Sequence, residues 1–370
     1  MISLAQRVTA FRSDEFQKVF RKQQSIKHPI DLSVGVPEEL TPEHIKAAGI
    51  RAIQRDKTVY TPANGIIELR QAIAEKLEAE NNIHAPSESI SVVPGLTTGL
   101  FLVYLALLDP GDQIIVIDPY YPPYVHLANA IGAQAITVPC LNTFQPDIAA
   151  IEKAITPKTK AIIVNSPNNP TGAVYSEATL KRIVAIAKER DIIIISDEIY
   201  EHFAPAGDHI STRILYDKTI TMNGFSKAYA MTGWRLGYIH GPKDVIDAIN
   251  NLQQYTVFSS SSIAQHAAVA ALQHPRAISN PYDKKRMYVI SRLRKMGLTV
   301  HGAAGGYYVF FQVPILDIDF VDQAAAHSLL LLPGRAFSAR RDFVRLSYGA
   351  SMKTLEKGLD ILEKIMKTLV

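Results

Sequence analysis

The chain has 370 residues, more than one compact core normally holds and enough for two domains. Apolar residues make up 47% of it and charged residues 20%, which is typical of a soluble globular protein. The 39 basic and 35 acidic residues are mixed along the chain, and the short basic runs at 284–286 and 340–341 are flanked by aspartates, which argues against a nucleic-acid partner.

The single cysteine, Cys140, excludes an intrachain disulfide and favours a reducing compartment. Residues 1–20 lack the apolar core of a secretion signal, and the most apolar stretch, 99–108, is too short to cross a bilayer. We therefore expect a cytoplasmic protein without a membrane partner. The histidines are not spaced as metal ligands, so we expect no metal site. The glycine-rich loops of nicotinamide and nucleoside-triphosphate sites do not occur in the sequence.

The middle of the chain alternates short apolar runs with amphipathic helices. The runs are apolar on both faces, as in the strands of a covered parallel sheet; they are residues 114–117, 161–164, 192–195 and 219–222. Ser176 can cap a helix whose apolar face is formed by Leu180, Ile183, Val184 and Ala187. This pattern predicts an α/β domain over residues 39–277.

The end of the chain has an α+β pattern. A charged helix near 282–296 precedes strand-like segments at 306–313 and 343–348, and a last helix, capped by Ser351, presents leucines along one face. We expect a second, smaller domain built from both termini, residues 1–38 and 278–370. A ligand site is expected in the cleft between the two domains.

Lys227 carries the strongest chemical signal, because it closely follows the predicted strand 219–222, at the sheet edge where α/β domains bind ligands. An apolar setting there lowers the pKa of a lysine and makes its amine a nucleophile. Arg235 follows eight residues later, and its guanidinium suits a phosphate. Taken alone, however, a lysine after a strand is more often a surface cation.

Two other predicted strands end in polar groups. Asp197 ends a very apolar strand, where a carboxylate is costly unless it meets a cation such as a protonated pyridine nitrogen. The alternative for Asp197 is that it caps the following helix. Asn169 lies in a turn-rich loop after the strand 161–164, and a ligand role there is favoured by the neighbouring motifs.

A further segment resembles an anion site. Residues 94–99, Pro-Gly-Leu-Thr-Thr-Gly, precede an apolar helix expected at 100–108. Backbone amides at a helix start, together with the Thr97 hydroxyl, can bind an anion.

These segments resemble the motifs of the class I and II aminotransferases, pyridoxal-phosphate enzymes of fold type I (the aspartate aminotransferase fold), over nearly the whole chain from about Ile30. Seven motifs occur in the family order: Asp31-Leu-Ser-Val-Gly35-Val-Pro, Tyr60-Thr-Pro-Ala-Asn-Gly-Ile-Ile-Glu-Leu-Arg70, Pro110-Gly-Asp112, Asn169-Pro-Thr-Gly172, Asp197-Glu-Ile-Tyr200, Ser226-Lys227 and Val344-Arg345-Leu-Ser347. The resemblance implies a mostly parallel sheet covered by helices plus a smaller α+β domain. It also implies an enzyme of amino acid metabolism that moves an amino group from an L-amino acid to a 2-oxo acid.

The resemblance also implies roles for single residues. Lys227 matches the lysine that carries the cofactor as a Schiff base and moves the proton, and Asp197 matches the partner of the pyridine nitrogen. Tyr200 and Asn169 match the contacts to the phenolic oxygen, and Tyr121 matches the ring that stacks on the cofactor. The cup for the cofactor phosphate is matched by Gly95, Leu96, Thr97, Ser226 and Arg235, together with Tyr60 from a neighbouring subunit. The grip on the substrate α-carboxylate is matched by Arg345, Gly35 and Asn169. Sharing Tyr60 implies a homodimer.

Two departures from the family pattern are visible. Many relatives carry a phosphate-binding serine where this chain has Gly224, so the cup loses one hydrogen bond or Ser226 replaces it. The stretch 313–333, which in the family includes a helix and a strand, is shorter than usual, so we expect a differently shaped entrance near 322–332.

Alternative readings remain open at this point. A carbon–sulfur β-lyase or a cyclopropane-forming synthase would use the same scaffold, and a non-catalytic cofactor-binding regulator is a third reading. The loop 256–262 supplies no cation for a distal carboxylate, whereas Lys57, Arg340 and Arg341 are candidates. We therefore favour neutral or aromatic amino acids as donors, with 2-oxoglutarate as a possible acceptor.

Overall fold

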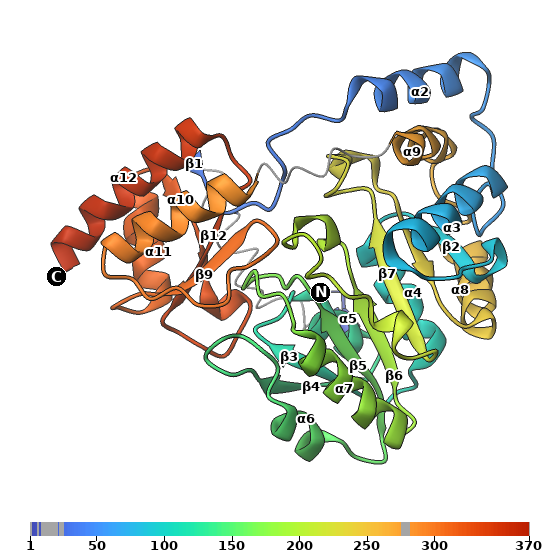
Figure 1. Cartoon of the computed structure of the whole chain (residues 1–370), viewed down its shortest axis with the longest axis horizontal. Coiled ribbons are helices and arrows are strands. Elements are labelled where there is room, and N and C mark those ends of the chain that lie inside the picture. Colours follow the sequence, from blue (N-terminus) through green and yellow to red (C-terminus); the bar gives the residue numbers. More distant parts are fainter. Residues whose placement is uncertain (1, 6, 9–20, 22–25, 275–281, 370) are drawn as a thin grey trace.

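The computed structural model describes the whole chain except residues 1, 6, 9–20, 22–25, 275–281 and 370. A seven-stranded sheet forms the centre of the larger region, with strand order β2-β8-β7-β6-β5-β3-β4 (Figure 1). Strands β4, β3, β5, β6 and β7 run parallel, and β8 lies antiparallel between β7 and β2. The strands are β2 (Ile90–Val93), β3 (Gln113–Asp118), β4 (Gln134–Pro139), β5 (Thr159–Asn165), β6 (Ile193–Asp197), β7 (Thr219–Gly224) and β8 (Gly237–His240).

The four predicted strands are confirmed as β3, β5, β6 and β7, although Ile192 lies just outside β6. Strands β2, β4 and β8 were not predicted. β4 is an edge strand with several half-buried or exposed side chains, and β2 and β8 have four residues each, so none carries a long apolar run. Their place in the sheet depends on partners far away in the sequence.

Helices cover both faces of this sheet. On one face, α4 (Leu96–Leu107), α5 (Pro123–Ala130) and α8 (Lys243–Thr256) contribute to one hydrophobic core, whereas α6 (Ile148–Ala154) and α7 (Glu177–Glu189) contribute to another. The cap of α7 is confirmed: Ser176 Oγ accepts a hydrogen bond from the Thr179 amide at 3.2 Å, and the predicted apolar face is buried. A third core joins α2 (Glu43–Gln54), α3 (Ile67–Asn81) and α9 (Ser262–Gln273), of which α2 and α9 lie side by side (Figure 1).

The helix predicted at 100–108 begins four residues earlier than expected, at Leu96. Gly95, with a φ of +83°, is the N-cap residue, so the two threonines that were expected to precede the helix lie within its first turn. No helix among the described residues is both long enough and apolar enough to span a membrane.

The smaller region contains a three-stranded antiparallel sheet of order β11-β12-β9 and a two-stranded parallel sheet of β1 and β10. The strands are β1 (Ile30–Asp31), β9 (Tyr308–Gln312), β10 (Leu329–Leu330), β11 (Leu332–Pro333) and β12 (Phe343–Ser347), and the helices are α10 (Tyr282–Lys295), α11 (Asp317–Ala326) and α12 (Met352–Leu369). The predicted charged helix, two strands and last helix are thus confirmed, and Ser351 Oγ accepts from the Thr354 amide at 3.1 Å. Residues 313–333 contain α11, β10 and β11, so this stretch includes a helix and strands.

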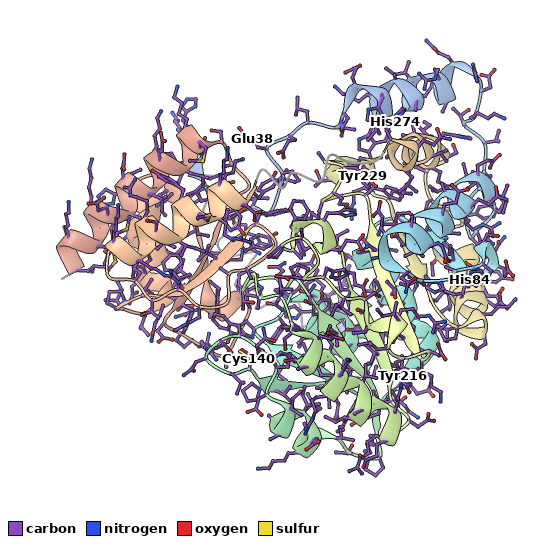
Figure 2. The ribbon with its side chains drawn as sticks, viewed as in Figure 1. Glu38, His84, Cys140, Tyr216, Tyr229 and His274 are labelled. Atoms are coloured by element: carbon purple, nitrogen blue, oxygen red, sulfur yellow. The ribbon has the colours of Figure 1, made fainter. Side chains whose placement is uncertain are left out.

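The two regions are joined by packing and by hydrogen bonds. One hydrophobic core runs from Ile115 and Ile162 in the seven-stranded sheet to Phe310 and Leu346 in the smaller sheet. Glu38 lies on the segment that crosses between the regions (Figure 2), and its carboxylate is 2.6 Å from the Lys285 ammonium on α10. The segment that follows β1 is therefore held against the smaller region before it continues to α2.

Candidate active site

A cavity of about 310 Å³ lies where the carboxyl ends of β5, β6 and β7 meet the start of α4, the segment 34–36 and the strands β9 and β12. Parallel strands end at the same edge of a sheet, which is why motifs far apart in the sequence converge there. The predicted residues that line this cavity are Gly35, Leu96, Thr97, Tyr121, Asn169, Asp197, Tyr200, Ser226, Lys227, Arg235 and Arg345.

Lys227 follows β7 and reaches into the cavity, where its Nζ donates to the Gly35 carbonyl oxygen at 2.6 Å. The same nitrogen lies 5.9 Å and 5.8 Å from the ring centroids of Tyr200 and Tyr307. Burial lowers the pKa of Lys227, and the positive charges of Arg345 and Arg235 lower it further. A lysine with a lowered pKa has a larger fraction of free amine at neutral pH and can act as a nucleophile and a base.

Asp197 is buried at the end of β6, and burial raises its pKa to about 6 in spite of two hydrogen bonds that lower it. Its Oδ2 accepts from the Tyr124 hydroxyl at 2.7 Å, and its Oδ1 accepts from the Ile199 amide at 3.2 Å. The capping alternative is wrong, because the next helical turn, η3 (Glu201–Phe203), has Tyr200 as its N-cap residue. Asp197 forms no ion pair among the described residues, so a cationic ring nitrogen would supply the partner that a buried carboxylate needs.

The start of α4 and Arg235 together form a cradle for an anion. Gly95 is the N-cap residue of α4 and offers no side chain, and a Cβ built on it would lie 2.4 Å from Arg235 Nη2. Thr97 Oγ1, in the first turn of α4, lies 3.4 Å from the Tyr121 hydroxyl, which places both groups beside the helix start. Free amides, hydroxyls and a guanidinium at one point suit a phosphate.

The structure explains why Gly224 replaces a serine. Gly224 pairs with Gly237 across β7 and β8, and a Cβ on Gly224 would lie 2.8 Å from Gly237 Cα. No side chain fits between these backbones without a shift of the strands. Ser226, two residues later, lines the cavity and is the nearby hydroxyl that can reach a phosphate.

Arg345 is buried on β12 and aligned by neighbours on four sides. Its Nη1 donates to Asn169 Oδ1 at 2.9 Å and its Nη2 to the Ser33 carbonyl oxygen at 2.6 Å, while the rings of Tyr308 and Phe337 lie 4.3 Å and 4.6 Å from its Cζ. Its Nε is buried and has no hydrogen-bond partner among the described residues. A buried guanidinium with an unused donor is costly unless an anion binds there, which favours a ligand role for Arg345.

Several predicted residues lie outside this cavity. Tyr60 is 82% exposed, and its ring packs against Phe258 at 4.5 Å, so it does not complete the cavity of its own chain. Arg340 stacks on Phe144 and Phe343 and donates to the sulfur of Cys140, whose position Figure 2 marks. Lys57 and Arg341 do not line the cavity either.

Three aromatic residues of the site were not predicted. Tyr124 holds Asp197, Tyr308 lies between Arg345 and Tyr200, and Phe337 covers the second face of Arg345. In the sequence, each resembles an ordinary apolar residue of a helix, strand or loop. The alternation of residues along β9 could have placed Tyr308 on the same face as Arg345 only if the register between β9 and β12 had been known.

The sequence and the structure of the chain are both similar to those of known aminotransferases. The family model for aminotransferase class I and II matches residues 27–362. The chain is 38% identical to the aspartate/prephenate aminotransferase of Thermus thermophilus and 34% identical to aromatic-amino-acid aminotransferase 2 of Thermococcus litoralis, with 99% of each chain covered in both cases. The solved structure of Thermus thermophilus aspartate aminotransferase with maleate is 36% identical, with a TM-score of 0.94 over 99% of this chain and 100% of that one.

Proposed function

Because the chain belongs to the class I and II aminotransferases, and is therefore a pyridoxal-phosphate-dependent enzyme that transfers amino groups between amino acids and 2-oxo acids, we propose which of its residues do this work. The observation that carries the proposal is the meeting of Lys227, Asp197, Arg345 and the anion cradle of α4 in one cavity. The named relatives are aminotransferases, which favours transfer over elimination.

Pyridoxal phosphate fits the residues that are present. Arg235, Ser226, Thr97 and the amide of Leu96 would hold its phosphate, and Gly95, which has no side chain, would leave room for it beside Arg235. Tyr121 would cover one face of the ring. When bound, the cofactor supplies an electron-accepting ring to the reaction.

Asp197 would hold a proton on the ring nitrogen. The protonated ring nitrogen would supply the cationic partner that the buried Asp197 carboxylate lacks, so each charge would stabilise the other. Tyr200 and Asn169 would donate to the phenolic oxygen. Since Asn169 Oδ1 already accepts from Arg345, its amide nitrogen is the group left to donate.

Lys227 would move the proton from the substrate α-carbon. Its side chain lines the cavity, and its lowered pKa favours the free amine that a general base requires. Its Nζ donates to the Gly35 carbonyl oxygen, so the side chain reaches the segment that we propose borders the substrate carboxylate.

Arg345 would bind the α-carboxylate through the edge that includes its unpaired Nε, with Gly35 and Asn169 beside it. A two-point contact between a guanidinium and a carboxylate fixes the orientation of the amino acid. By fixing the carboxylate, Arg345 would decide which bond of the α-carbon is broken. It would favour removal of the α-hydrogen, which Lys227 can accept, over loss of carbon dioxide.

For the donor we propose a neutral or aromatic amino acid, with 2-oxoglutarate as an acceptor. Among the described residues that line the cavity, the cations are Lys227, Arg235 and Arg345, and each has a role already. The rest of the lining includes Val34, Val36 and several tyrosines, which suit an apolar side chain.

We further propose a cytoplasmic homodimer in which Tyr60 completes the phosphate cup of the partner subunit. Tyr60, Val59 and Tyr255 are 82%, 73% and 91% exposed, and Phe258 packs against Tyr60. Exposed aromatic and apolar side chains of this kind are typical of an interface. We also propose two domains, a large one of residues 39–277 and a small one of residues 1–38 and 278–370. The separate sheets of the two regions support this division.

The test is a visible spectrum of the purified protein during the addition of single amino acids without an acceptor. We expect the yellow band of the bound cofactor to fade to the pyridoxamine form with release of one equivalent of oxo acid, most strongly for neutral or aromatic donors. A band that persists with every donor, or fades only briefly while ammonia appears, would contradict the assignment.

A further inference from the structure

Tyr308 contacts two groups of the proposed site at once. It begins β9 opposite Ser347, whereas Arg345 pairs with Phe310, so Tyr308 and Arg345 are diagonal neighbours on one face of the sheet. The ring centroid of Tyr308 lies 4.3 Å from Arg345 Cζ, and its hydroxyl lies 3.0 Å from the hydroxyl of Tyr200.

The segment before α2 confines the Tyr308 hydroxyl from a third side. A Cβ built on Gly35 would lie 1.6 Å from Tyr308 Oη, so the backbone of Gly35 packs directly against this oxygen. The ring is buried between the sheet and the cavity. Tyr308 therefore has little freedom to move away from either Tyr200 or Arg345.

The direction of the bond between the two hydroxyls decides what Tyr200 can do. Burial raises the pKa of Tyr200 well above its ordinary value, so Tyr200 keeps its single proton. If Tyr308 donates to Tyr200, that proton is available to the cavity; if Tyr200 donates to Tyr308, it is not. An accepted hydrogen bond also polarises a hydroxyl and strengthens the bond that it donates.

We propose that Tyr308 is a positioning residue for the reaction: its hydroxyl donates to Tyr200 and directs the Tyr200 proton toward the phenolic oxygen of the cofactor, and its ring orients the carboxylate-binding Arg345. The inference rests on the proposed function of this cavity. It adds a residue to which the motifs of the sequence assign no role.

Two variants separate the hydroxyl from the ring. Tyr308→Phe keeps the ring against Arg345 and removes only the bond to Tyr200, whereas Tyr308→Leu removes both. The purified holoenzyme is titrated with pH while the visible absorbance of bound pyridoxal phosphate is recorded, and kcat and KM are measured for the best amino donor.

We expect Tyr308→Phe to raise the midpoint of the spectral titration by roughly half a pH unit to one unit, since a hydrogen bond to the phenolic oxygen favours its anion. Its kcat should fall while its KM stays within about twofold of the wild-type value. Tyr308→Leu should show the same spectral shift and a KM higher by roughly tenfold, because the guanidinium loses one of its two stacked rings.

A matched control is Tyr348→Phe. Tyr348 is buried in the same region, but its hydroxyl donates to the Gly306 carbonyl oxygen at 3.0 Å. Its spectral midpoint should equal that of the wild type. In a Tyr200→Phe background, Tyr308→Phe should cause no further shift of the spectral midpoint. The Tyr200 hydroxyl, which would accept the hydrogen bond from Tyr308, is already absent there.

Three outcomes would overturn the proposal: a wild-type midpoint in Tyr308→Phe, an equal shift in Tyr348→Phe, or a full additional shift in the Tyr200→Phe background. Failure of the proposed function looks different. In that case the wild-type protein itself would show no cofactor band or no amino transfer, whatever the Tyr308 variants do.

Discussion

At the scale of single residues, the site combines buried charges with neighbours that control their protonation. Lys227 has a lowered pKa and Asp197 a raised one, and burial is the first cause of both shifts. Burial favours the neutral form of each group. The cavity therefore holds an amine that can accept a proton and a carboxylate that needs a cation, and both features match the proposed chemistry.

Lys227→Ala should reduce kcat by at least about 10³-fold while pyridoxal phosphate still binds, because the phosphate cradle and Asp197 remain and only the proton carrier is lost. Cofactor content is measured by absorbance after gel filtration, and turnover by oxo acid production. Turnover at the wild-type rate would show that another group moves the proton.

Tyr124→Phe should move the acid limb of the pH profile of kcat upward, by up to about one pH unit. The Tyr124 hydroxyl bonds to the carboxylate of Asp197 at 2.7 Å and lowers the pKa of that carboxyl, so its loss raises this pKa and Asp197 becomes protonated at higher pH. Tyr104→Phe is the control, because the Tyr104 hydroxyl donates to the backbone oxygen of Tyr124, at 3.0 Å, and not to the Asp197 carboxylate in the part of the chain that the structure describes. An acid limb that stays in place in Tyr124→Phe would exclude this influence on Asp197.

At the scale of elements, a buried ion pair joins α3 to the turn that follows β6. Lys76 on α3 contacts Glu201 in η3, and both side chains are buried. Asn81 and Asn223 donate to the same carboxylate at 2.6 Å and 2.7 Å, so α3 and the end of β7 are linked through one residue. The end of β7, which leads to Lys227, is thus fixed to α3 by these hydrogen bonds.

Lys76→Met should lower the free energy of unfolding by about 3–5 kcal/mol, because it leaves the Glu201 carboxylate buried without its cation. Lys181→Met, which breaks an exposed pair with Glu177, should cost less than about 1 kcal/mol. Urea denaturation measures both. Similar decreases in the free energy of unfolding in the two variants would mean that the buried pair contributes no more to stability than an exposed one.

The same pair predicts a pH dependence. Burial alone would raise the pKa of Glu201, but Lys76 and the nearby histidines outweigh it and hold this pKa well below its ordinary value. The stability from Glu201 is therefore present above the ordinary pKa of a glutamate and is lost as the pH falls toward the folded-state value. In Lys76→Met this acid-sensitive part of the stability should be much smaller.

At the scale of the whole molecule, the proposed homodimer would build each active site from two chains. Lys227 lines the cavity of its own chain, whereas Tyr60 lies on the surface. A dimer with shared sites places these two residues of one chain in different active sites. That arrangement makes the assembly testable by mixing variants.

Mixing Lys227→Ala with Tyr60→Ala chains should restore activity that neither variant has alone. Each mixed dimer has one site with both residues intact and one with neither, so complete random exchange should give about a quarter of the wild-type activity. The chains are exchanged in mild denaturant and assayed after dialysis. No gain over the separate variants would show that Tyr60 does not act across the interface.

The fold class, the cofactor and most of the residues that line the cavity could be predicted from local patterns and motifs in the sequence. Apolar runs on both faces indicated β3, β5, β6 and β7, and the rule that parallel strands end at one edge placed Lys227, Asp197 and Asn169 together. These signals are local, so they can be read from short segments. Four features were not predicted: the edge strand β4, the short strands β2 and β8, and the early start of α4. They depend on packing against distant segments and not on a local periodicity of apolar residues.

The residues that surround and orient the motif residues are known only from the three-dimensional fold. Tyr124 meets Asp197 from 73 positions away in the sequence, and Tyr308 meets Tyr200 from 108 positions away. The close approach of Gly224 and Gly237, which leaves no room for a serine, follows from the register of β7 and β8. Such contacts are set by strand register and by the packing of distant segments, and a local sequence pattern does not specify which distant side chain arrives at a given place.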